Sequence, residues 1–193
     1  MQHTANSMSV SSQAQSSGAH DRRSFNIIAL ILGIAMLAGF TLLPRLATSP
    51  NAMVGKPAPN FVLPVIHNGG KGDRVELSNL QGQAVVLSFW ASWCGPCRAE
   101  APSVDRLARR LKDKGVTVLG VNTNDDPNAA VAFAQRAGLS FPIVSDEEGT
   151  VGASFGVSSL PTLVVVDKTG KVVAVRAGLT DESSLESLAL SAR

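Results

Sequence analysis

The sequence predicts an α/β fold, in which a mixed central sheet carries helices on both faces and is preceded by one N-terminal transmembrane helix. Uninterrupted apolar runs, typical of buried strands, alternate with segments whose apolar residues recur at helical spacing. A hairpin pattern near the C-terminus adds antiparallel strands to this α/β order, which predicts a mixed sheet. A charge-free apolar run of 19 residues lies near the N-terminus and is long enough for a membrane span.

The N-terminal part divides into a tail and an apolar segment. Residues 1–24 are rich in Ser and Gln and lack apolar periodicity, which predicts a disordered cytoplasmic tail. Residues 25–43 would span about 28 Å as a helix, close to the ~30 Å hydrocarbon core of a bilayer. A cleaved signal peptide remains the alternative, but its apolar core usually has about 7–15 residues. Arg22 and Arg23 precede the segment and only Arg45 closely follows it, which places the N-terminus in the cytoplasm.

A linker over residues 44–53 leads to a domain over residues 54–193. After a short extended piece at 61–65 and a turn at 67–72, we expect strands at 84–90, 116–121, 143–145, 162–166 and 171–176. Helices are expected at 97–112, 127–137 and 181–191. Pro127 suits the first turn of its helix and Gly138 suits the end. Pro102 lies inside the first of these helices and is expected to kink it.

The charges of this domain exclude a nucleic-acid-binding face. Three of the 17 Lys and Arg residues and one of the 15 Asp and Glu residues precede position 51, which leaves 14 of each in the remainder. A neutral domain without a basic cluster lacks the electrostatic attraction that nucleic acid requires. We therefore expect no nucleic-acid partner.

The cysteine content narrows the chemistry further. The chain has two cysteines, Cys94 and Cys97, which excludes a disulfide-dense scaffold. A structural zinc site needs four ligands, and His67 is the only histidine after the apolar segment. His67 follows the extended piece in a Gly-rich stretch and is expected to be solvated. The sequence thus predicts neither a metal nor a cofactor.

Trp93-Cys94-Gly95-Pro96-Cys97 lies between a buried strand and the start of a helix. Unpaired N–H groups at a helix N-terminus lower the pKa of a thiol, and the thiolate is the form that attacks a disulfide. The two-residue spacing lets the second sulfur resolve a mixed disulfide within the protein. Haem attachment would need His at position 98, where the chain has Arg98. A purely structural disulfide remains as an alternative.

Two motifs resemble the thioredoxin superfamily: FWASWCGPC before a helix, and Leu160-Pro161-Thr162 before a strand. Four motifs in order resemble its TlpA/ResA-like branch over about residues 54–190: GKPAPNFVL from Gly55, LSNLQG over 77–82, CRAEAP over 97–102, and GVSSLPT over 156–162. The resemblance implies a thioredoxin-like fold in which Pro161 is cis and packs beside the cysteines.

The same resemblance implies a thiol–disulfide oxidoreductase with Cys94 as nucleophile and Cys97 as resolving cysteine. It implies a substrate groove formed by the residues Trp93, Gly95, Pro96, Leu160 and Pro161. Members of the branch are membrane-anchored reductases whose soluble domain faces the bacterial periplasm or the cell exterior. They reduce disulfides in apocytochrome c or in proteins of copper-centre assembly, and a membrane electron donor of the CcdA/DsbD type reduces them again.

Glu100 is a further candidate, because it follows Cys97 by three positions and so lies on the same side of the helix. A carboxylate desolvated near the sulfurs can accept or donate a proton during exchange. Related reductases carry Glu here, and the chain has Ser88 where thioredoxin has a buried Asp. The alternative is that Glu100 only complements the helix dipole.

Three rival functions have sequence requirements of their own. A peroxiredoxin would need Pro and then Thr or Ser at the positions of Leu87 and Ala91. A copper metallochaperone would need a wider cysteine spacing and a histidine after Cys97. A periplasmic oxidase or isomerase stays open, although the Gly95-Pro96 pair matches reducing thioredoxins.

Overall fold

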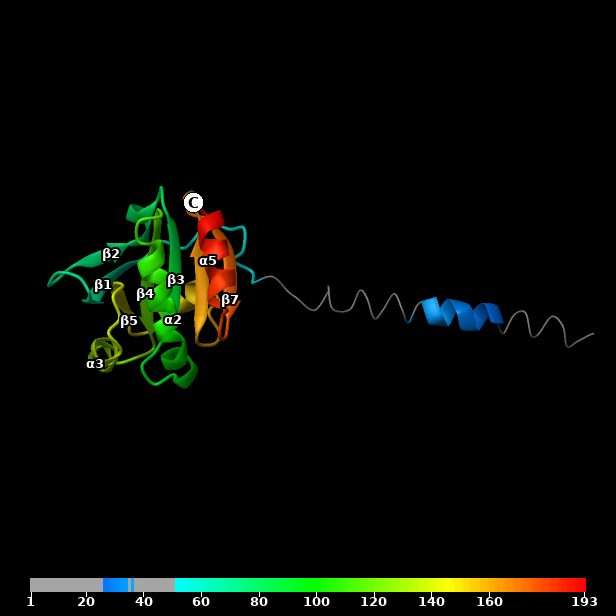
Figure 1. The fold of residues 1–193 in the computed structure, drawn as a ribbon, viewed down its shortest axis with the longest axis horizontal. Coiled ribbons are helices and arrows are strands. Elements are labelled where there is room, and N and C mark those ends of the chain that lie inside the picture. The colour runs from blue at the N-terminus through cyan, green and yellow to red at the C-terminus, as the bar shows by residue number, and fades with distance from the viewer. Residues whose placement is uncertain (1–25, 35, 37–50) are drawn as a thin grey trace, which may run out of the picture. The chain divides into compact units, whose positions relative to one another are not determined.

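The structure is a computed structural model that describes residues 26–34, 36 and 51–193 (Figure 1). Residues 26–34 and 36 are helical. The tail expected over 1–24, the remaining residues of the expected transmembrane segment and most of the expected linker lie outside the described residues. In the part of the chain that is described, none of the helices combines the length and the apolar character needed to cross a bilayer.

The chain from residue 51 onward belongs to one compact unit built on a seven-stranded sheet. The strand order across the sheet is β2-β1-β5-β4-β3-β6-β7. The strands are β1 (Val62–His67), β2 (Arg74–Glu76), β3 (Ala84–Trp90), β4 (Val116–Thr123), β5 (Ile143–Asp146), β6 (Thr162–Val166) and β7 (Val172–Ala177).

The predicted mixed sheet is confirmed. β3 pairs in parallel with β4, and β4 pairs in parallel with β5, whereas β6 is antiparallel to both β3 and β7. Trp90, at the end of β3, is the register partner of Asn122 on β4, and Asn122 is the partner of Ser145 on β5. The carboxyl ends of these three strands therefore meet at one edge of the sheet. Cys94 follows β3 at this edge.

Helices and irregular segments cover both faces of the sheet, as the sequence predicted. The helices are α2 (Gly95–Leu111), α3 (Pro127–Ala137), α4 (Thr150–Ser154) and α5 (Glu182–Ser191), with a 3-10 turn η1 (Leu77–Leu80). One core layer contains Leu107 of α2, Ala134 of α3 and Leu185 of α5. The other contains Leu77 of η1 and Phe155, which follows α4. The sheet is thus sandwiched between two apolar layers.

Helix α2 begins at Gly95, two residues before the expected start at Cys97, because Cys94 caps it. The helix continues as one element through Pro102 to Leu111. Leu107 and Leu111 are buried, whereas Arg109 and Arg110 are exposed, so α2 has an apolar face toward the core and a basic face toward solvent.

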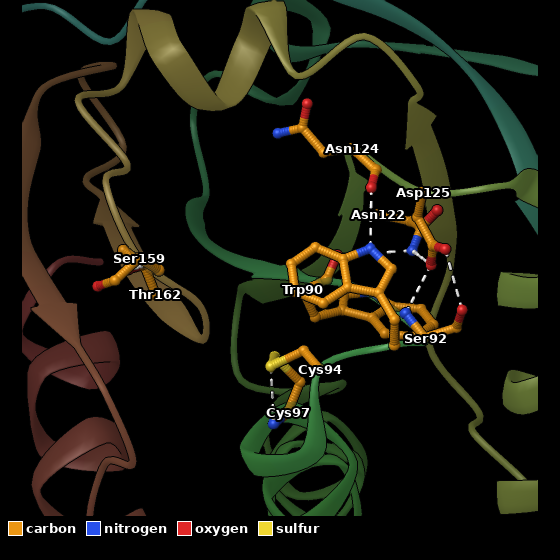
Figure 2. The surroundings of a disulfide bond; sticks show 10 residues. Trp90, Ser92, Cys94, Cys97, Asn122, Asn124, Asp125, Ser159 and Thr162 are labelled. Carbon is orange, nitrogen blue, oxygen red and sulfur yellow. Dashed lines mark hydrogen bonds between the residues drawn. A yellow bond between two sulfur atoms is a disulfide. The ribbon is translucent and has the colours of Figure 1, made fainter.

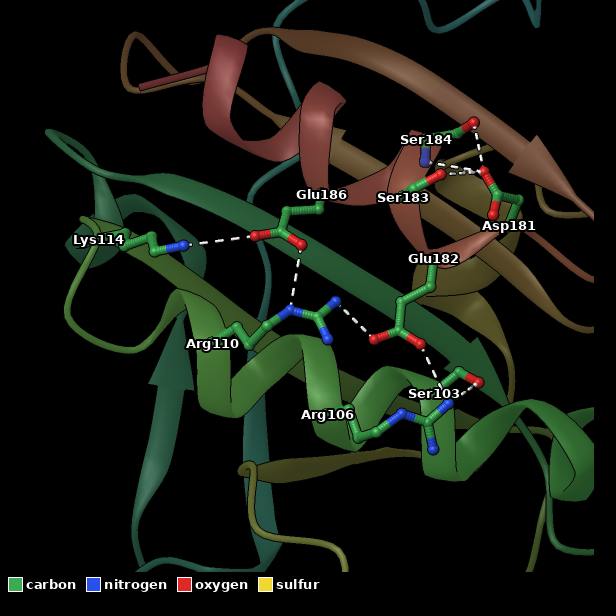
Figure 3. A network of polar contacts seen from close by, with 9 residues as sticks. All are labelled: Ser103, Arg106, Arg110, Lys114, Asp181, Glu182, Ser183, Ser184 and Glu186. Atoms are coloured by element: carbon green, nitrogen blue, oxygen red, sulfur yellow. Dashed lines mark hydrogen bonds and ion pairs between the residues drawn. The ribbon is translucent and has the colours of Figure 1, made fainter.

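Ion pairs join α2 to α5 on the exposed side of the two helices (Figure 3). Arg110 contacts both Glu182 and Glu186, while Arg106 pairs with Glu182 and Lys114 pairs with Glu186. Beneath this network, Leu185 of α5 is buried in the same core layer as α2. The C-terminal helix α5 is therefore held on the domain both by buried apolar contacts and by exposed ion pairs.

Three short elements, β2, η1 and α4, were not predicted. The expected turn beginning at His67 was wrong in its start: His67 is the last residue of β1. Its side chain is half-buried, and its Nε2 lies 2.9 Å from the carbonyl oxygen of Leu139. The Gly-rich turn begins at the next residue, because β1 continues further than the apolar pattern indicates.

The segment before β1 lies along one outer edge of the sheet. The Gly55 N–H donates to the Val172 carbonyl oxygen at 2.8 Å, and the Val172 N–H donates to the Lys56 carbonyl oxygen at 2.9 Å. Ala58 donates to the Gly170 carbonyl oxygen at 2.8 Å. The beginning of β7 is therefore paired on both sides.

Candidate active site

Cys94 and Cys97 form a disulfide at the N-terminus of α2, with their Cα atoms 5.3 Å apart (Figure 2). Cys94 is the N-cap residue, in an extended backbone conformation, and its Sγ accepts a 3.2 Å hydrogen bond from the Cys97 N–H. Pro96 occupies the first turn, where its missing N–H costs no helical hydrogen bond. A thiolate at Cys94 would therefore face an N–H donor and the positive end of the helix dipole.

The surface beside the disulfide is formed by residues predicted to contact substrate. Both cysteines are buried, at 5% and 3% exposed, whereas the adjoining Trp93 is 63% exposed. Gly95 and Pro96 are exposed as well. A partner that reaches Cys94 would thus meet an exposed indole and the first turn of α2.

The loop between β3 and α2 is tied to the loop between β4 and α3. The Trp93 Nε1–H donates to the Asn124 carbonyl oxygen at 2.9 Å. The Asp125 carboxylate accepts hydrogen bonds from both the N–H and the Oγ–H of Ser92, and another from Asn122. Figure 2 shows Ser92, Asn122, Asn124 and Asp125 in the surroundings of the disulfide. The two loops are neighbours because β3 and β4 are parallel neighbours in the sheet.

The segment before β6 carries the second predicted motif. The Leu160–Pro161 peptide bond is cis, as the resemblance implied. Pro161 is buried and Leu160 is half-buried. Figure 2 includes Ser159 and Thr162, which flank this bond, among the surroundings of the disulfide. The Pro161 carbonyl oxygen accepts a 2.8 Å hydrogen bond from the Gly178 N–H, which joins this segment to the loop after β7.

Glu100 lies behind the disulfide, on the side of α2 that faces the core. It is 6% exposed, and its Oε1 accepts a 2.9 Å hydrogen bond from the Thr180 N–H. Burial raises the pKa of Glu100, and the hydrogen bond from Thr180 opposes this shift. A carboxyl group with a raised pKa can accept and return a proton nearer to neutral pH than an exposed one.

Glu100 and Cys97 line the same narrow cavity of about 10 Å³. Ser88 and Trp90 contribute to the wall, together with Ala101, Val104, Leu139 and Phe141. Trp90 is 5% exposed, and its ring packs on Phe133 with centroids 5.5 Å apart. The site therefore places a carboxyl group and the second cysteine at one small internal space.

Sequence reasoning missed Ser92, Asn124, Asp125 and Thr180. The Asn-Asp pair after β4 could have been found, because the carboxyl ends of neighbouring parallel strands meet at the edge that carries Cys94. Thr180 gives no such signal, since its role depends on a backbone N–H that meets Glu100 through the tertiary fold.

Comparison with known proteins agrees with this geometry. Residues 54–175 match the AhpC/TSA family. The thiol-disulfide oxidoreductase ResA of Bacillus thuringiensis (strain Al Hakam) is 34% identical over 167 residues, covering 86% of this chain and 94% of the relative. ResA of Bacillus subtilis (strain 168) is also 34% identical, over 85% of this chain and 90% of the relative.

Solved structures give the same result. A candidate thiol:disulfide interchange protein DsbE from Chlorobium tepidum superposes with a TM-score of 0.66 at 35% identity, covering 72% of this chain and 96% of that one. A secreted thiol-disulfide isomerase from Corynebacterium glutamicum gives a TM-score of 0.63 at 29% identity, covering 69% of this chain and 83% of that one.

The fold and the disulfide define a thioredoxin-like thiol–disulfide oxidoreductase. The chain belongs to the AhpC/TSA family, among its ResA-like members.

Proposed function

We propose that the protein is a membrane-anchored, extracytoplasmic reductase of protein disulfides, with Cys94 as nucleophile and Cys97 as resolving cysteine. The observation that carries this proposal is the position of Cys94 as N-cap of α2, where its Sγ accepts the Cys97 N–H. This position favours the thiolate of Cys94 over that of a cysteine further along the helix.

In the first step the Cys94 thiolate of the reduced protein attacks one sulfur of a substrate disulfide. A bond forms between Cys94 Sγ and that sulfur, and the substrate S–S bond breaks. The other substrate sulfur leaves as a thiolate and takes a proton from water. The exposed Trp93 and the segment with Leu160 and Pro161 form the groove that receives the substrate chain.

In the second step Cys97 loses its proton, and its thiolate attacks Cys94 Sγ in the mixed disulfide. The Cys94–Cys97 bond forms, and the second substrate sulfur leaves as a thiolate that takes up a proton. The substrate gains two electrons and the protein becomes the disulfide seen in the structure. Glu100 accepts the proton of Cys97, which is supported by the cavity that the two residues share.

The proposed substrates are disulfides in apocytochrome c or in proteins of copper-centre assembly. The proposed source of electrons is a membrane protein of the CcdA/DsbD type. Residues 25–43 would anchor the protein in the bacterial cytoplasmic membrane, with the domain in the periplasm or cell exterior. The charge-free apolar run and the resemblance to membrane-anchored reductases support these assignments.

The reduction potential of the Cys94–Cys97 pair tests the direction of the reaction. The full-length protein in detergent would be equilibrated with glutathione or a reference thioredoxin, and its free thiols counted. A potential near or below that of thioredoxin, about −270 mV, is expected for a reductase. A potential near about −120 mV would contradict the proposal and assign the protein to disulfide formation instead.

A further inference from the structure

Asp125, a residue without an assigned role, accepts four hydrogen bonds beside the loop that carries Cys94. Its side chain is buried, with 9% of the residue exposed. The carboxylate accepts a 2.5 Å hydrogen bond from the Ser92 N–H and a 2.9 Å hydrogen bond from the Ser92 Oγ–H. It also accepts from Asn122 Nδ2 at 2.8 Å and from the Asp126 N–H at 3.0 Å. Hydrogen bonds to an ionised acceptor are stronger than neutral ones.

These contacts control a specific piece of backbone. Ser92 lies two residues before Cys94, between the end of β3 and the start of α2. The next residue, Trp93, is held by the carbonyl oxygen of Asn124, the neighbour of Asp125. Two consecutive residues of the cysteine loop are therefore fixed by two consecutive residues of the β4–α3 loop (Figure 2).

The hydrogen bonds between the two loops matter more in one redox state of the Cys94–Cys97 pair than in the other. In the oxidised protein the disulfide holds Cys94 at Cys97 covalently. In the reduced protein that bond is gone, and the N-cap geometry of Cys94 depends on the loop that leads to it. The hydrogen bond from the Cys97 N–H then survives only if the Ser92–Cys94 backbone keeps its place.

We propose that Asp125 is a positioning residue for thiol–disulfide exchange. By holding Ser92, it keeps Cys94 at the N-terminus of α2 after the disulfide opens, so that the Cys97 N–H still stabilises the Cys94 thiolate. Asp125 acts through Ser92, since its four hydrogen bonds go to residues other than the cysteines. This inference rests on the proposed function, in which Cys94 is the nucleophile.

The position of Cys94 and the charge of Asp125 have opposite effects on the thiolate. Loss of the N-cap geometry removes a donor from the thiolate and raises the pKa of the Cys94 thiol. Loss of a nearby negative charge by itself would lower that pKa. Of the other titratable groups near the sulfurs, Cys97, Arg98 and Glu100 all belong to α2 and remain unchanged in the variants below. The direction of the change therefore separates positioning from simple electrostatics.

The test measures the alkylation of Cys94 by iodoacetamide as a function of pH, in the reduced full-length protein in detergent, with the modified cysteine identified by mass spectrometry. In Asp125→Ala we expect the midpoint of the curve of alkylation rate against pH to rise by about one pH unit. Below the midpoint this makes the alkylation of Cys94 about tenfold slower. Ser92→Ala keeps the carboxylate and the Ser92 N–H but loses one donor. It should move the midpoint in the same direction with a smaller, about threefold, effect.

Asp126→Ala is the matched control, because Asp126 is exposed and caps α3 through Asn128 rather than holding Ser92. Its midpoint should stay at that of the unchanged protein. The inference is overturned if Asp125→Ala leaves the midpoint unchanged or lowers it, or if Asp126→Ala raises it equally. If Asp125→Ala does not fold, the inference depends on Ser92→Ala and is overturned by an unchanged midpoint there. Preferential alkylation of Cys97 in the unchanged protein would instead refute the proposed function.

Discussion

The Thr180 N–H donates a 2.9 Å hydrogen bond to Glu100 Oε1 across 80 positions of the sequence. Two residues earlier, the Gly178 N–H donates to the carbonyl oxygen of Pro161. The loop after β7 therefore contacts both the buried carboxyl group behind Cys97 and the cis-proline segment of the proposed substrate groove. A substitution of Glu100 would thus remove or alter a contact of the same loop that also supports this groove.

Replacement of Glu100 should reveal the cost of burying its charge. Burial raises the pKa of Glu100 above 4.5, so the stability associated with its protonated form is complete below that value and is lost as pH rises through the raised pKa. Gln cannot ionise and can still accept the Thr180 N–H. Oxidised Glu100→Gln should therefore melt at a higher temperature than the unchanged protein at neutral pH, with a difference that shrinks toward acid pH.

Thermal unfolding of the oxidised proteins at a series of pH values measures this difference. Glu148→Gln, which removes an exposed carboxyl group, is the charge-matched control. A Glu100→Gln variant that is less stable by the same amount at every pH would show that the carboxylate is not a buried charge but a structural hydrogen-bond partner.

The two cysteines should behave differently when each is replaced by serine. Cys94→Ser removes the proposed nucleophile and should lower the rate of dithiol-dependent disulfide reduction by more than about a hundredfold. Cys97→Ser should still attack but lack the resolving thiol, so a mixed disulfide should accumulate. Non-reducing electrophoresis followed by mass spectrometry detects the trapped species. Activity retained by Cys94→Ser would show that Cys94 is not the nucleophile.

Trp93 should affect protein substrates more than small ones. Its indole is 63% exposed and fixed by Asn124, so it can bury area against a substrate chain at little entropic cost. We expect Trp93→Ala to raise KM for a protein disulfide about tenfold, while the rate with a small aromatic disulfide changes little. Val62→Ala, at an exposed apolar residue of β1, is the control. An equal loss of activity toward the protein disulfide and the small disulfide would argue against a role of Trp93 in docking the substrate.

The attachment of α5 should depend more on burial than on charge. Leu185 is 3% exposed in the core layer shared with α2, and Leu185→Ala should lower the free energy of unfolding by about 2–5 kcal/mol. Glu186→Gln breaks exposed ion pairs with Arg110 and Lys114, and its effect should be much smaller and should vanish at high salt. Urea unfolding with and without added salt distinguishes the two contributions.

Sequence reasoning found the elements that carry a helical period or a run of apolar residues, including the short strands β5 and β6. β3 has six apolar residues and Ser88, and all seven residues are buried. On α2, the buried Leu107 and Leu111 alternate with exposed arginines, which is a local signal of the same kind. The elements β2, η1 and α4 have three, four and five residues, and they mix polar with apolar residues, whereas the five-residue β6 has four consecutive apolar residues. His67 was misjudged because nearby glycines indicate a turn, whereas β1 is extended to it by pairing with β5.

The residues of the candidate site also fall into those that the sequence predicted and those that only the structure revealed. Cys94, Cys97 and Pro161 lie in local motifs that the sequence displays directly. Asp125 and Thr180 meet the site only through strand order and loop packing, which a linear pattern does not contain. Sequence therefore indicates the groups that react, and the fold indicates the groups that hold them.

The pairing of Gly55 and Lys56 with Val172 has a consequence for self-association. An outer strand with free N–H and C=O groups is a template for another chain, and here the residues before β1 already occupy the start of β7. A truncated chain that begins after Ala58 would leave this stretch open to edge-to-edge pairing between copies. Gly55, Lys56 and Ala58, at the start of the domain, thus cover a stretch of outer strand that would otherwise be open to pairing with another copy.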